Sequence, residues 1–243
     1  MLAVSIVMPA YNAASTLERT YSEIPHEVVD NIILEDDASY DNTVGISKSL
    51  QIQTIIHTEN KGYGANQKTC YQVALEGKTD IIIMLHPDYQ YTPKLITAMV
   101  SPLAEEVFDC MLGSRILGEG ALKGGMPYYK FVANRFLTLI QNFLLNYKIS
   151  EYHTGYRAYT REILESVNWQ NNSDDFIFDN QILAQIIYAG YSIGEISCPS
   201  LYTEESSSIN LQRSIWYGIG VLITSIQYRL SKWGIYKSNL FSE

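Results

Sequence analysis

The chain has 243 residues, enough for one α/β domain with a sizeable buried core. Hydrophobic residues make up 47% of it and charged residues 18%, which excludes a disordered or low-complexity protein. The net charge is −9. This acidic balance argues against nucleic acid as a partner, because phosphate backbones are bound by clustered Lys and Arg.

The cysteines and the N-terminus both bear on the cellular compartment. Three widely spaced cysteines indicate neither a disulfide framework nor a zinc site. No charged segment precedes an apolar one at the N-terminus, as a secretory signal would require. We therefore predict a cytoplasmic protein.

The first 113 residues alternate short apolar runs with segments of helical spacing. Helices are predicted at 14–23 with Ser15 as N-cap, from Asn42 or Thr43, at Gln67–Glu76 and at Leu95–Leu103. The apolar runs between them predict five strands: Val4–Met8, Asn31–Leu34, Gln53–His57, Ile81–Leu85 and Asp109–Gly113. Such alternation predicts an open parallel sheet with right-handed crossovers.

The second half of the chain is less regular. Helical spacing predicts helices at Tyr128–Leu145 and Phe178–Ala189, the second ended by Gly190. Ser150–Tyr159 is interpreted as a turn followed by a strand, and Ser192–Ile196 as a late strand. No repeat or linker marks a second domain, so we predict one domain over residues 1–209 and a helical tail over 210–243.

The tail is basic and aromatic. Residues 211–243 hold four basic residues and one acid, a charge of +3, so the first 210 residues carry −12. The uncharged run Ile215–Ile226 is twelve residues long, short of the ~20 that cross a bilayer. Three interpretations remain open: the tail packs on the domain, pairs two subunits in a homodimer, or lies peripherally at the inner face of a membrane.

A polar cluster follows each of the five predicted strands. The clusters are PAYN, EDDAS, ENKGYG, HPDYQ and GSR, in chain order. In open α/β sheets, ligands bind beyond the carboxyl ends of the strands. Five clusters at such ends therefore predict a single binding site.

HPDYQ is the candidate metal site. Asp88 and Gln90 can present oxygens to one divalent ion, and Mg²⁺ or Mn²⁺ prefers oxygen ligands, often shared with substrate phosphates. His86 is a third candidate ligand. The competing interpretations are that Asp88 shapes a turn after Pro87 and that His86 is simply a packed or hydrogen-bonded histidine.

Other clusters suit a nucleotide. Asp36 or Asp37 could accept hydrogen bonds from a base edge or a ribose hydroxyl, although acids are also common near helix N-termini. Two glycines in ENKGYG permit close approach of the backbone to a ligand. The cluster is neither a P-loop nor the dinucleotide fingerprint, since neither pattern occurs.

Together the clusters resemble the inverting nucleotide-sugar glycosyltransferases of family 2. The matching motifs, over about residues 3 to 200, are PAYN, DDAS with DNT, NKGYGANQ, HPDYQYTP, GSR and TGYRAY. The last two resemble the branch that contains dolichyl-phosphate mannose synthases and bacterial polyprenyl-phosphate sugar transferases. The resemblance implies the GT-A fold, an α/β fold with a mostly parallel central sheet and helices on both faces.

The resemblance also implies an activity and its site. It implies transfer of a sugar from a UDP-, GDP- or dTDP-linked donor to a saccharide or lipid-linked acceptor in polysaccharide, glycolipid or cell-envelope synthesis, with Mg²⁺ or Mn²⁺ as cofactor. The implied metal ligands are Asp88, Gln90 and His86. The implied nucleotide-sugar residues are Pro9, Tyr11, Asn12, Asp36, Asp37, Gly62, Gly64, Asn66, Pro87, Gln90 and Arg115.

Two departures from the family pattern affect the prediction. His86 replaces the first Asp of the DxD motif, which removes one carboxylate from the metal site. Residues 202–208 (YTEESSS) replace a segment that binds lipid phosphate, and both of its basic positions are lost. The second departure favours a hydroxyl acceptor over a phosphate acceptor.

A hydroxyl acceptor needs a general base, because it must lose its proton as it attacks. Asp179 is the predicted base: it stands eleven residues before Gly190, as in many family members. Asp174, Asp175 and Glu151 are rivals. The alternative functions are transfer to a polyprenyl phosphate, which needs no base, and non-catalytic binding of a nucleotide sugar.

Overall fold

A computed structural model describes residues 2–202 and 211–241 of the chain. Within these residues a seven-stranded sheet runs in the order β3-β2-β1-β4-β6-β5-β7. Its strands are β1 (Val4–Ala10), β2 (Asn31–Asp36), β3 (Gln53–Ile56), β4 (Ile81–Met84), β5 (Cys110–Ser114), β6 (Arg157–Thr160) and β7 (Ile193–Ser197). All five strands predicted in the first half are present, and the boundary predicted between residues 209 and 210 lies outside the described residues.

The sheet is parallel except at one strand. β1 pairs in parallel with β2 and β4, β2 with β3, and β5 with β7. β6 lies antiparallel between β4 and β5. Because β6 runs against its neighbours, its first residues lie at the same edge of the sheet as the carboxyl ends of β4 and β5. The mostly parallel sheet is confirmed, and this reversed strand brings the segment before Arg157 to the ligand-binding edge.

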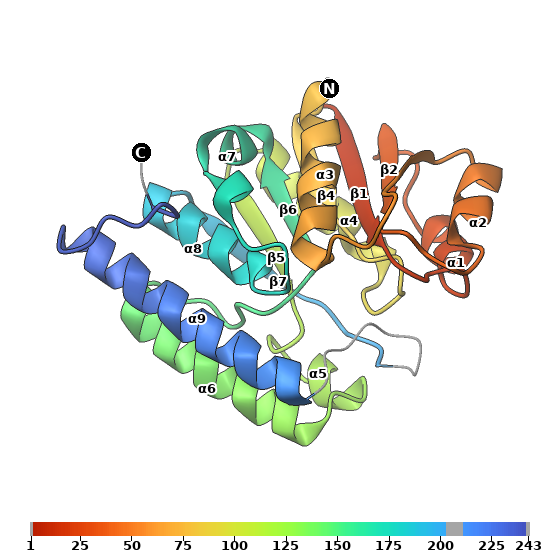
Figure 1. Cartoon of the computed structure of the whole chain (residues 1–243). Coiled ribbons are helices and arrows are strands. Elements are labelled where there is room, and N and C mark those ends of the chain that lie inside the picture. Colours follow the sequence, from red (N-terminus) through yellow and green to blue (C-terminus); the bar gives the residue numbers. More distant parts are fainter. Residues whose placement is uncertain (1, 203–210, 242–243) are drawn as a thin grey trace.

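Helices cover both faces of the sheet (Figure 1). They are α1 (Leu17–Ser22), α2 (Thr43–Ser49), α3 (Tyr63–Glu76), α4 (Ile96–Ala104), α5 (Gly120–Lys123), α6 (Tyr128–Leu145), α7 (Arg161–Ser166), α8 (Phe178–Ala189) and α9 (Leu211–Lys232), with short 3₁₀ turns at Pro93–Leu95 and Trp169–Asn171. Successive residues of a strand point to opposite faces, so Ile82 and Met84 enter one core and Ile81 and Ile83 the other. This double burial explains why β4 is a continuous apolar run.

Two predicted helix starts are corrected. α1 begins after Thr16 rather than Ser15, and no side chain caps it; the backbone N–H of Leu17 instead donates to the carbonyl of Ala13. α3 begins at Tyr63, one turn before the predicted Gln67. Its first turn is stabilised from outside, because the N–H groups of Gly64 and Ala65 donate to the carbonyl oxygen of Asp174. Such a contact between distant segments leaves no trace in local sequence.

α6 and α9 form a layer of their own, below the sheet in Figure 1. α9 packs on α6 and α8, so the described part of the tail contacts the domain. The two helices run in the same direction: Gly218 lies opposite Leu137, and Arg229 donates to the carbonyl of Phe143. No helix in the described residues combines the length and the hydropathy needed to cross a bilayer.

Candidate active site

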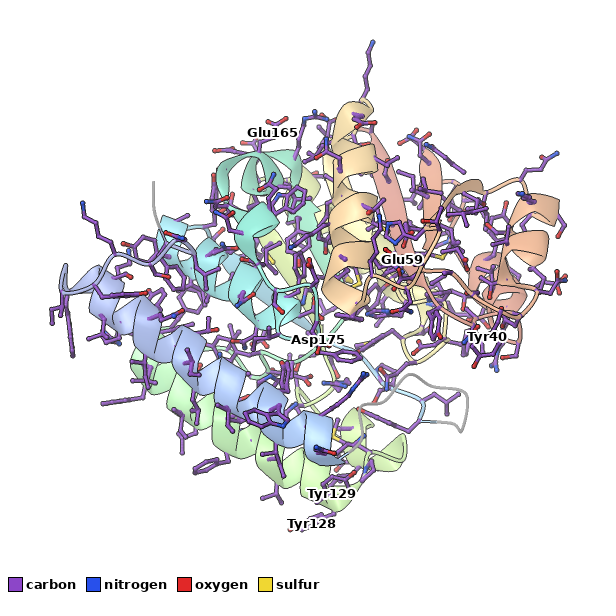
Figure 2. All side chains as sticks on the ribbon, in the orientation of Figure 1. Tyr40, Glu59, Tyr128, Tyr129, Glu165 and Asp175 are labelled. Atoms are coloured by element: carbon purple, nitrogen blue, oxygen red, sulfur yellow. The ribbon has the colours of Figure 1, made fainter. Side chains whose placement is uncertain are left out.

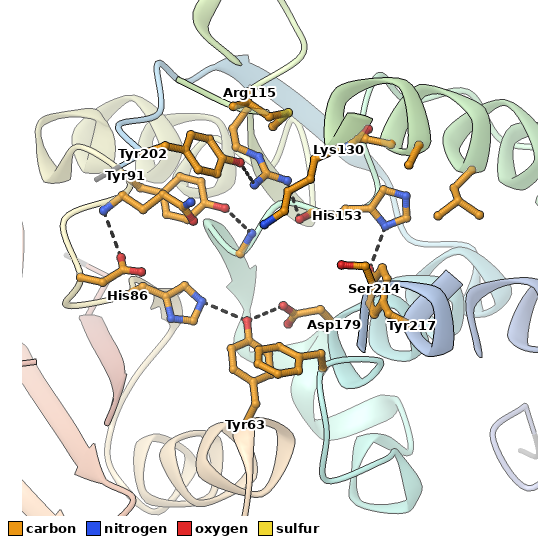
Figure 3. Close-up of a pocket in the computed structure, with 18 residues that line it drawn as sticks. Tyr63, His86, Tyr91, Arg115, Lys130, His153, Asp179, Tyr202, Ser214 and Tyr217 are labelled. Carbon is orange, nitrogen blue, oxygen red and sulfur yellow. Dashed lines mark hydrogen bonds between the residues drawn. The ribbon is translucent and has the colours of Figure 1, made fainter. Parts of the chain in front are cut away.

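A pocket lies at the edge of the sheet where β4 and β5 end and β6 begins (Figure 3). Its wall includes side chains from the HPDYQ and GSR clusters, from the start of α8, and from the inner sides of α6 and α9. Of the residues predicted from sequence, it brings together His86, Asp88, Gln90, Arg115 and Asp179.

The HPDYQ turn presents Asp88 and Gln90 to this pocket. Both are mostly buried, with 8% and 7% of their surface exposed, and Asp88 Oδ1 accepts a hydrogen bond from the backbone N–H of Gln90 at 3.0 Å. Tyr89 between them adopts a left-handed backbone with φ of 56°, which a residue with a side chain rarely does. The turn is thus held tightly, and it puts a carboxylate and an amide on the same wall.

Asp179 is the acid at the opposite side of the pocket. It lies in the first turn of α8 and is 7% exposed. Its carboxylate accepts hydrogen bonds from the Tyr63 hydroxyl at 2.6 Å and from Gln67 Nε2 at 3.0 Å. Figure 3 shows the Tyr63 hydroxyl between Asp179 and His86, whose Nε2 is 3.0 Å from it. The carboxylate is therefore held in one orientation by two residues of α3.

Tyr63 was not predicted from sequence, although it lies within NKGYGANQ. Its ring stacks on His86 and on Phe176, with centroids 5.5 and 4.7 Å away. Burial and the adjacent Asp179 carboxylate raise the pKa of Tyr63, so its hydroxyl stays protonated and serves as a donor. Tyr63 thus connects the predicted base to the predicted metal-site histidine.

The three rival acids lie elsewhere. Asp174 forms an ion pair with Lys68 and its side chain is 64% exposed, and Asp175 is also exposed. Neither lines the pocket. Glu151 is fully buried and is the partner of Arg115. Among the four acids considered from sequence, Asp179 is the one whose side chain lines the pocket.

Arg115 is held by its neighbours within the pocket wall. Its guanidinium donates to Glu151, to the Tyr202 hydroxyl at 2.8 Å and to the carbonyl of His153 at 2.7 Å. Although burial alone would raise the pKa of Glu151, Arg115 lowers it below its ordinary value. Asn134 of α6 also donates to the Glu151 carboxylate. Arg115 and Glu151 therefore form a buried, hydrogen-bonded ion pair.

Glu151→Ala should destabilise the fold by roughly 3–5 kcal/mol, because it leaves the Arg115 charge buried without its partner. Urea unfolding measures this free energy. Glu165→Ala is the matched control: it breaks the exposed Arg161 pair, which contributes at most about 1 kcal/mol. Equal losses in the two variants would show that Arg115 is neutralised some other way.

Asp37 was expected to bind a nucleotide, and its side chain forms hydrogen bonds with other residues of the protein. Its Oδ1 accepts from the N–H of Lys61 at 2.8 Å, its Oδ2 accepts from the N–H of Gly62 at 2.9 Å, and His57 Nδ1 lies 2.8 Å from Oδ1. Asp36 Oδ2 accepts from the N–H of Ser39. Asp37 thus shapes the loop that leads into α3.

The glycines and Asn66 of this loop likewise serve the protein itself. A Cβ on Gly62 or Gly64 would collide with the carbonyl oxygens of Asp174 and Ser173, so the close backbone approach is to the chain's own 173–174 segment. Gly62 also has a φ of 102°, which favours glycine. Asn66 Nδ2 donates to the carbonyl of Ala10 at 3.1 Å. The two glycines were expected to permit close approach of the backbone to a ligand, and the close approach that the structure shows is to the chain's own backbone.

The remaining predicted residues lie outside the pocket. Pro9 is buried in β1, and the carbonyl of Pro87 accepts from the Thr20 hydroxyl. Tyr11 is 49% exposed and meets the ring of Tyr40 edge-on. Asn12 Oδ1 accepts from the N–H of Tyr40, so PAYN and the segment after Asp37 are adjacent. These two loops form a partly exposed shelf beyond β1 and β2.

Glu35 lies beneath this shelf in a buried cluster with Asp37 and His57. Each offers one ligand atom within 4.8 Å of the others, close enough to hold a metal ion. Glu35 is fully buried, and within the described residues neither of its oxygens accepts a hydrogen bond; Oε1 is 3.0 Å from His57 Nδ1. Burial, then Asp37 and Asp36, raise the pKa of Glu35 to about 8.

This shift predicts a pH dependence of stability. An acid whose pKa is about 8 when folded and near 4.5 when unfolded contributes stability below pH 4.5, and that contribution is lost as the pH rises to 8. Glu35→Gln should therefore match the wild type at pH 5 and exceed its free energy of unfolding at pH 8 by roughly 1–3 kcal/mol. Urea unfolding at both pH values measures this. Glu27→Gln, on the surface, should leave the profile unchanged, and parallel profiles for all three proteins would contradict the assignment.

Several pocket residues have no counterpart in the predictions. They are Tyr91, Met126, Lys130, His153, Tyr202 and Tyr217. Burial lowers the pKa of His153 to about 4, so its ring is neutral, and its Nδ1 lies 2.8 Å from the Tyr217 hydroxyl of α9. Burial and then the nearby Arg115 lower the pKa of Lys130. Tyr91 lies within HPDYQYTP and Tyr202 within YTEESSS, but neither was assigned a role there, and the other four lie outside the motifs. Their position in the fold is what reveals them.

Comparison with known proteins identifies the family and the fold. Residues 5–167 match the family model of glycosyl transferase family 2. UDP-N-acetylglucosamine–dolichyl-phosphate N-acetylglucosaminyltransferase of Methanococcus voltae is 27% identical over 220 residues, covering 84% of this chain and 87% of that protein. Polyprenol monophosphomannose synthase of Mycolicibacterium smegmatis is 22% identical over 238 residues, covering 95% and 86%.

A solved structure shares the fold. The crystal structure of glucosyl-3-phosphoglycerate synthase from Mycobacterium tuberculosis, in complex with Mg²⁺ and uridine diphosphate, matches with a TM-score of 0.72 at 19% identity, covering 98% of this chain and 81% of that one. This likeness confirms the predicted GT-A fold. The family model covers well over half of the chain, and it carries the functional assignment. The chain belongs to glycosyl transferase family 2.

Proposed function

We propose that this glycosyltransferase moves a sugar from a nucleotide-diphosphate donor, with Mg²⁺ or Mn²⁺ bound at Asp88, to an acceptor deprotonated by Asp179. The observation that carries the proposal is the meeting of Asp88, Gln90 and Asp179 on one pocket at the carboxyl edge of the sheet. A carboxylate after a strand end can hold the metal ion that offsets the negative charge of the leaving diphosphate. A second, separately held carboxylate can take the proton of the acceptor.

The donor set fits a hard divalent cation. Asp88 and Gln90 offer oxygens and His86 a ring nitrogen from the same wall, and such ions commonly take few protein ligands and complete their shell with phosphate oxygens and water. When bound, the ion supplies positive charge that stabilises the departing nucleoside diphosphate. The cluster of Glu35, Asp37 and His57 suits this role less, because both Asp37 oxygens already accept backbone hydrogen bonds.

The nucleoside is proposed to lie on the shelf formed by PAYN and the segment after β2. Tyr11 offers an exposed aromatic face there, and Asp36 Oδ1 is buried without a hydrogen-bond partner in the described residues. Pro9, Asn12 and Pro87 shape the backbone around it. The loop that leads into α3 would support this shelf indirectly. It is held by Asp37, Gly62, Gly64 and Asn66.

Asp179 is proposed to take the proton of a hydroxyl acceptor. The two hydrogen bonds from Tyr63 and Gln67 hold its carboxylate in place, so that an oxygen can receive the proton without reorganisation. A carboxylate in this role is worth roughly 10²–10⁴ in rate.

A lipid-linked phosphate is the second candidate acceptor. Arg115 and Lys130 bring positive charge to the pocket, and Met126 and Leu137 add apolar surface beside them. Of the two relatives above, one is named for dolichyl phosphate and the other for the synthesis of polyprenol monophosphomannose. Residues 203–208, where the sequence lacks the basic pair expected for lipid phosphate, lie outside the described residues.

Titration calorimetry tests the donor site. UDP-, GDP- and dTDP-linked sugars are titrated with and without Mn²⁺, and turnover is followed by nucleotide release. We expect one nucleotide class to bind more tightly with Mn²⁺ and to release nucleotide when acceptor is added. Binding without transfer or donor hydrolysis would instead favour a nucleotide-sugar-binding protein, and no metal-dependent binding of any donor would refute the proposed site.

A further inference from the structure

α6 is amphipathic, but most of its buried residues are polar and its exposed side is apolar. The side of the helix that faces the protein is largely polar: three of its four buried residues are Asn134, Thr138 and Gln141, and the fourth is Leu145, close to the end of the helix. The side that faces solvent is apolar and follows helical spacing of three and four residues. This exposed stripe consists of Tyr129, Val132, Phe136, Leu139 and Phe143, each between 48% and 80% exposed. A soluble helix normally buries its apolar stripe, so α6 presents a surface suited to an apolar partner.

α9 carries a second stripe beside the first. Thr224 and Ser225 are among its buried residues, whereas large apolar residues are exposed at the same three- and four-residue spacing. They are Trp216, Ile219, Ile223 and Ile226, between 41% and 67% exposed. Because α6 and α9 pack side by side and run in the same direction, the two stripes belong to one layer at the edge of the molecule (Figure 1). Figure 2 shows Tyr128 and Tyr129 projecting outward from the start of α6.

The charge of the two helices distinguishes the partners that could cover this face. α6 contains Lys130 and Arg135, α9 contains Arg213, Arg229 and Lys232, and neither helix contains an Asp or Glu. In a protein of net charge −9, this layer of forty residues therefore carries +5, of which the Lys130 charge lines the pocket and the other four lie elsewhere on the two helices. A basic helix with aromatic and aliphatic residues on its apolar side is the pattern of helices that lie in the plane of an anionic membrane. A second copy of the chain would bring five more positive charges to the same layer.

The layer also continues into the active site. The inner sides of the same helices line the pocket, with Lys130, Asn134 and Leu137 from α6 and Ser214 and Tyr217 from α9. A bilayer against the outer side would therefore lie one helix layer away from the pocket that holds Asp88 and Asp179. A lipid-linked acceptor could reach that pocket while its hydrocarbon chain stays in the membrane.

We propose that the outer face of α6 and α9 docks on the surface of an anionic lipid bilayer, without spanning it, and so brings the pocket to a lipid-linked acceptor. The lipid-linked acceptor rests on the proposed function above. The docking itself rests on the exposed stripes and the charge of the helices.

Vesicle flotation of the full chain tests the docking. We expect the wild type to float with vesicles of phosphatidylcholine and phosphatidylglycerol, to remain below with phosphatidylcholine alone, and to lose binding at high salt, because the charge attraction is screened. The double variant Phe136→Glu/Trp216→Glu should bind the anionic vesicles roughly tenfold less or weaker still, since it puts carboxylates into the inserted stripe.

Val107→Glu is the matched control. It adds the same charge at a residue that is 59% exposed but lies on the turn before β5, away from both helices, and it should float like the wild type. Phe136 and Trp216 do not line the pocket, so the double variant should keep donor binding and donor hydrolysis; this readout separates failure of the docking from failure of the proposed function. The proposal would be overturned if the wild type does not bind anionic vesicles, or if the double variant still floats with them. A stable dimer in sedimentation that the double variant dissociates would also overturn it and assign the face to a second copy.

Discussion

Asp88→Ala is expected to abolish sugar transfer while leaving the fold intact. Asp88 lies in the turn after β4, at the pocket wall, and is the carboxylate of the proposed metal site. Metal stabilisation of a leaving diphosphate is worth several kcal/mol, so its loss should lower kcat by about 10³-fold or more. Initial rates at saturating donor and Mn²⁺ measure the effect, and circular dichroism with thermal unfolding checks the fold.

The control for this variant is Asp175→Ala. Asp175 is an exposed acid near the start of α8 that does not line the pocket, so its removal should leave turnover within about twofold, as expected for a surface change. Calorimetry should also show that Asp88→Ala no longer binds the donor more tightly with Mn²⁺ than without it. Wild-type turnover by Asp88→Ala would refute the metal assignment.

Asp179→Asn should lower kcat by roughly 10²–10⁴-fold with a hydroxyl acceptor, because an amide cannot take the acceptor's proton. KM for the donor should change little. The amide oxygen of Asn can still accept from Tyr63, but its NH₂ group cannot accept from Gln67, so the change removes the basicity of the carboxylate and keeps one of its two hydrogen bonds. Steady-state kinetics with each substrate varied in turn gives the two constants separately.

Tyr63→Phe is the companion variant. It leaves the Asp179 carboxylate basic but removes the hydrogen bond that orients it, so kcat should fall less than in Asp179→Asn. A polyprenyl phosphate acceptor provides the discriminating case. It is already ionised and needs no base, so a loss below about tenfold in Asp179→Asn with that acceptor would identify an enzyme that transfers the sugar to a lipid phosphate. Full activity of Asp179→Asn with every acceptor would remove Asp179 from the mechanism.

Local patterns predicted much of this fold. The apolar runs that became β1 and β4 are buried on both faces of a parallel sheet, and that burial is visible in sequence as uninterrupted hydrophobicity. β3, at the edge of the sheet, is only partly buried, and its run is correspondingly more polar. Tyr128–Leu145 and Phe178–Ala189 coincide with α6 and α8, because helical spacing and the left-handed Gly190 mark their extent. The late start predicted for α3 failed because the carbonyl of Asp174 stabilises its first turn from more than a hundred residues away.

The sequence likewise predicted some of the residues of the candidate site but not the role of others. Asp88, Gln90, Arg115 and Asp179 were predicted from sequence, and the pocket brings them together. Glu151 was one of three alternatives to Asp179 as the base, because nothing in a single sequence shows that it pairs with Arg115 in the interior. Asp37 was expected to face a ligand, yet it accepts hydrogen bonds from the loop before α3.

The amino-acid sequence by itself determined most of the strands and helices in their order along the chain, although α5 and α7 were not predicted, and the edge of the sheet at which the polar clusters gather. Those properties depend on the side-chain period and on neighbours close along the chain. Only the tertiary structure decided which carboxylates are open to the pocket, which are neutralised inside the protein, and which side of α6 faces water. Those outcomes depend on contacts between residues far apart in sequence, and there the cost of burying a charge or a polar group is set by the partner that packing supplies.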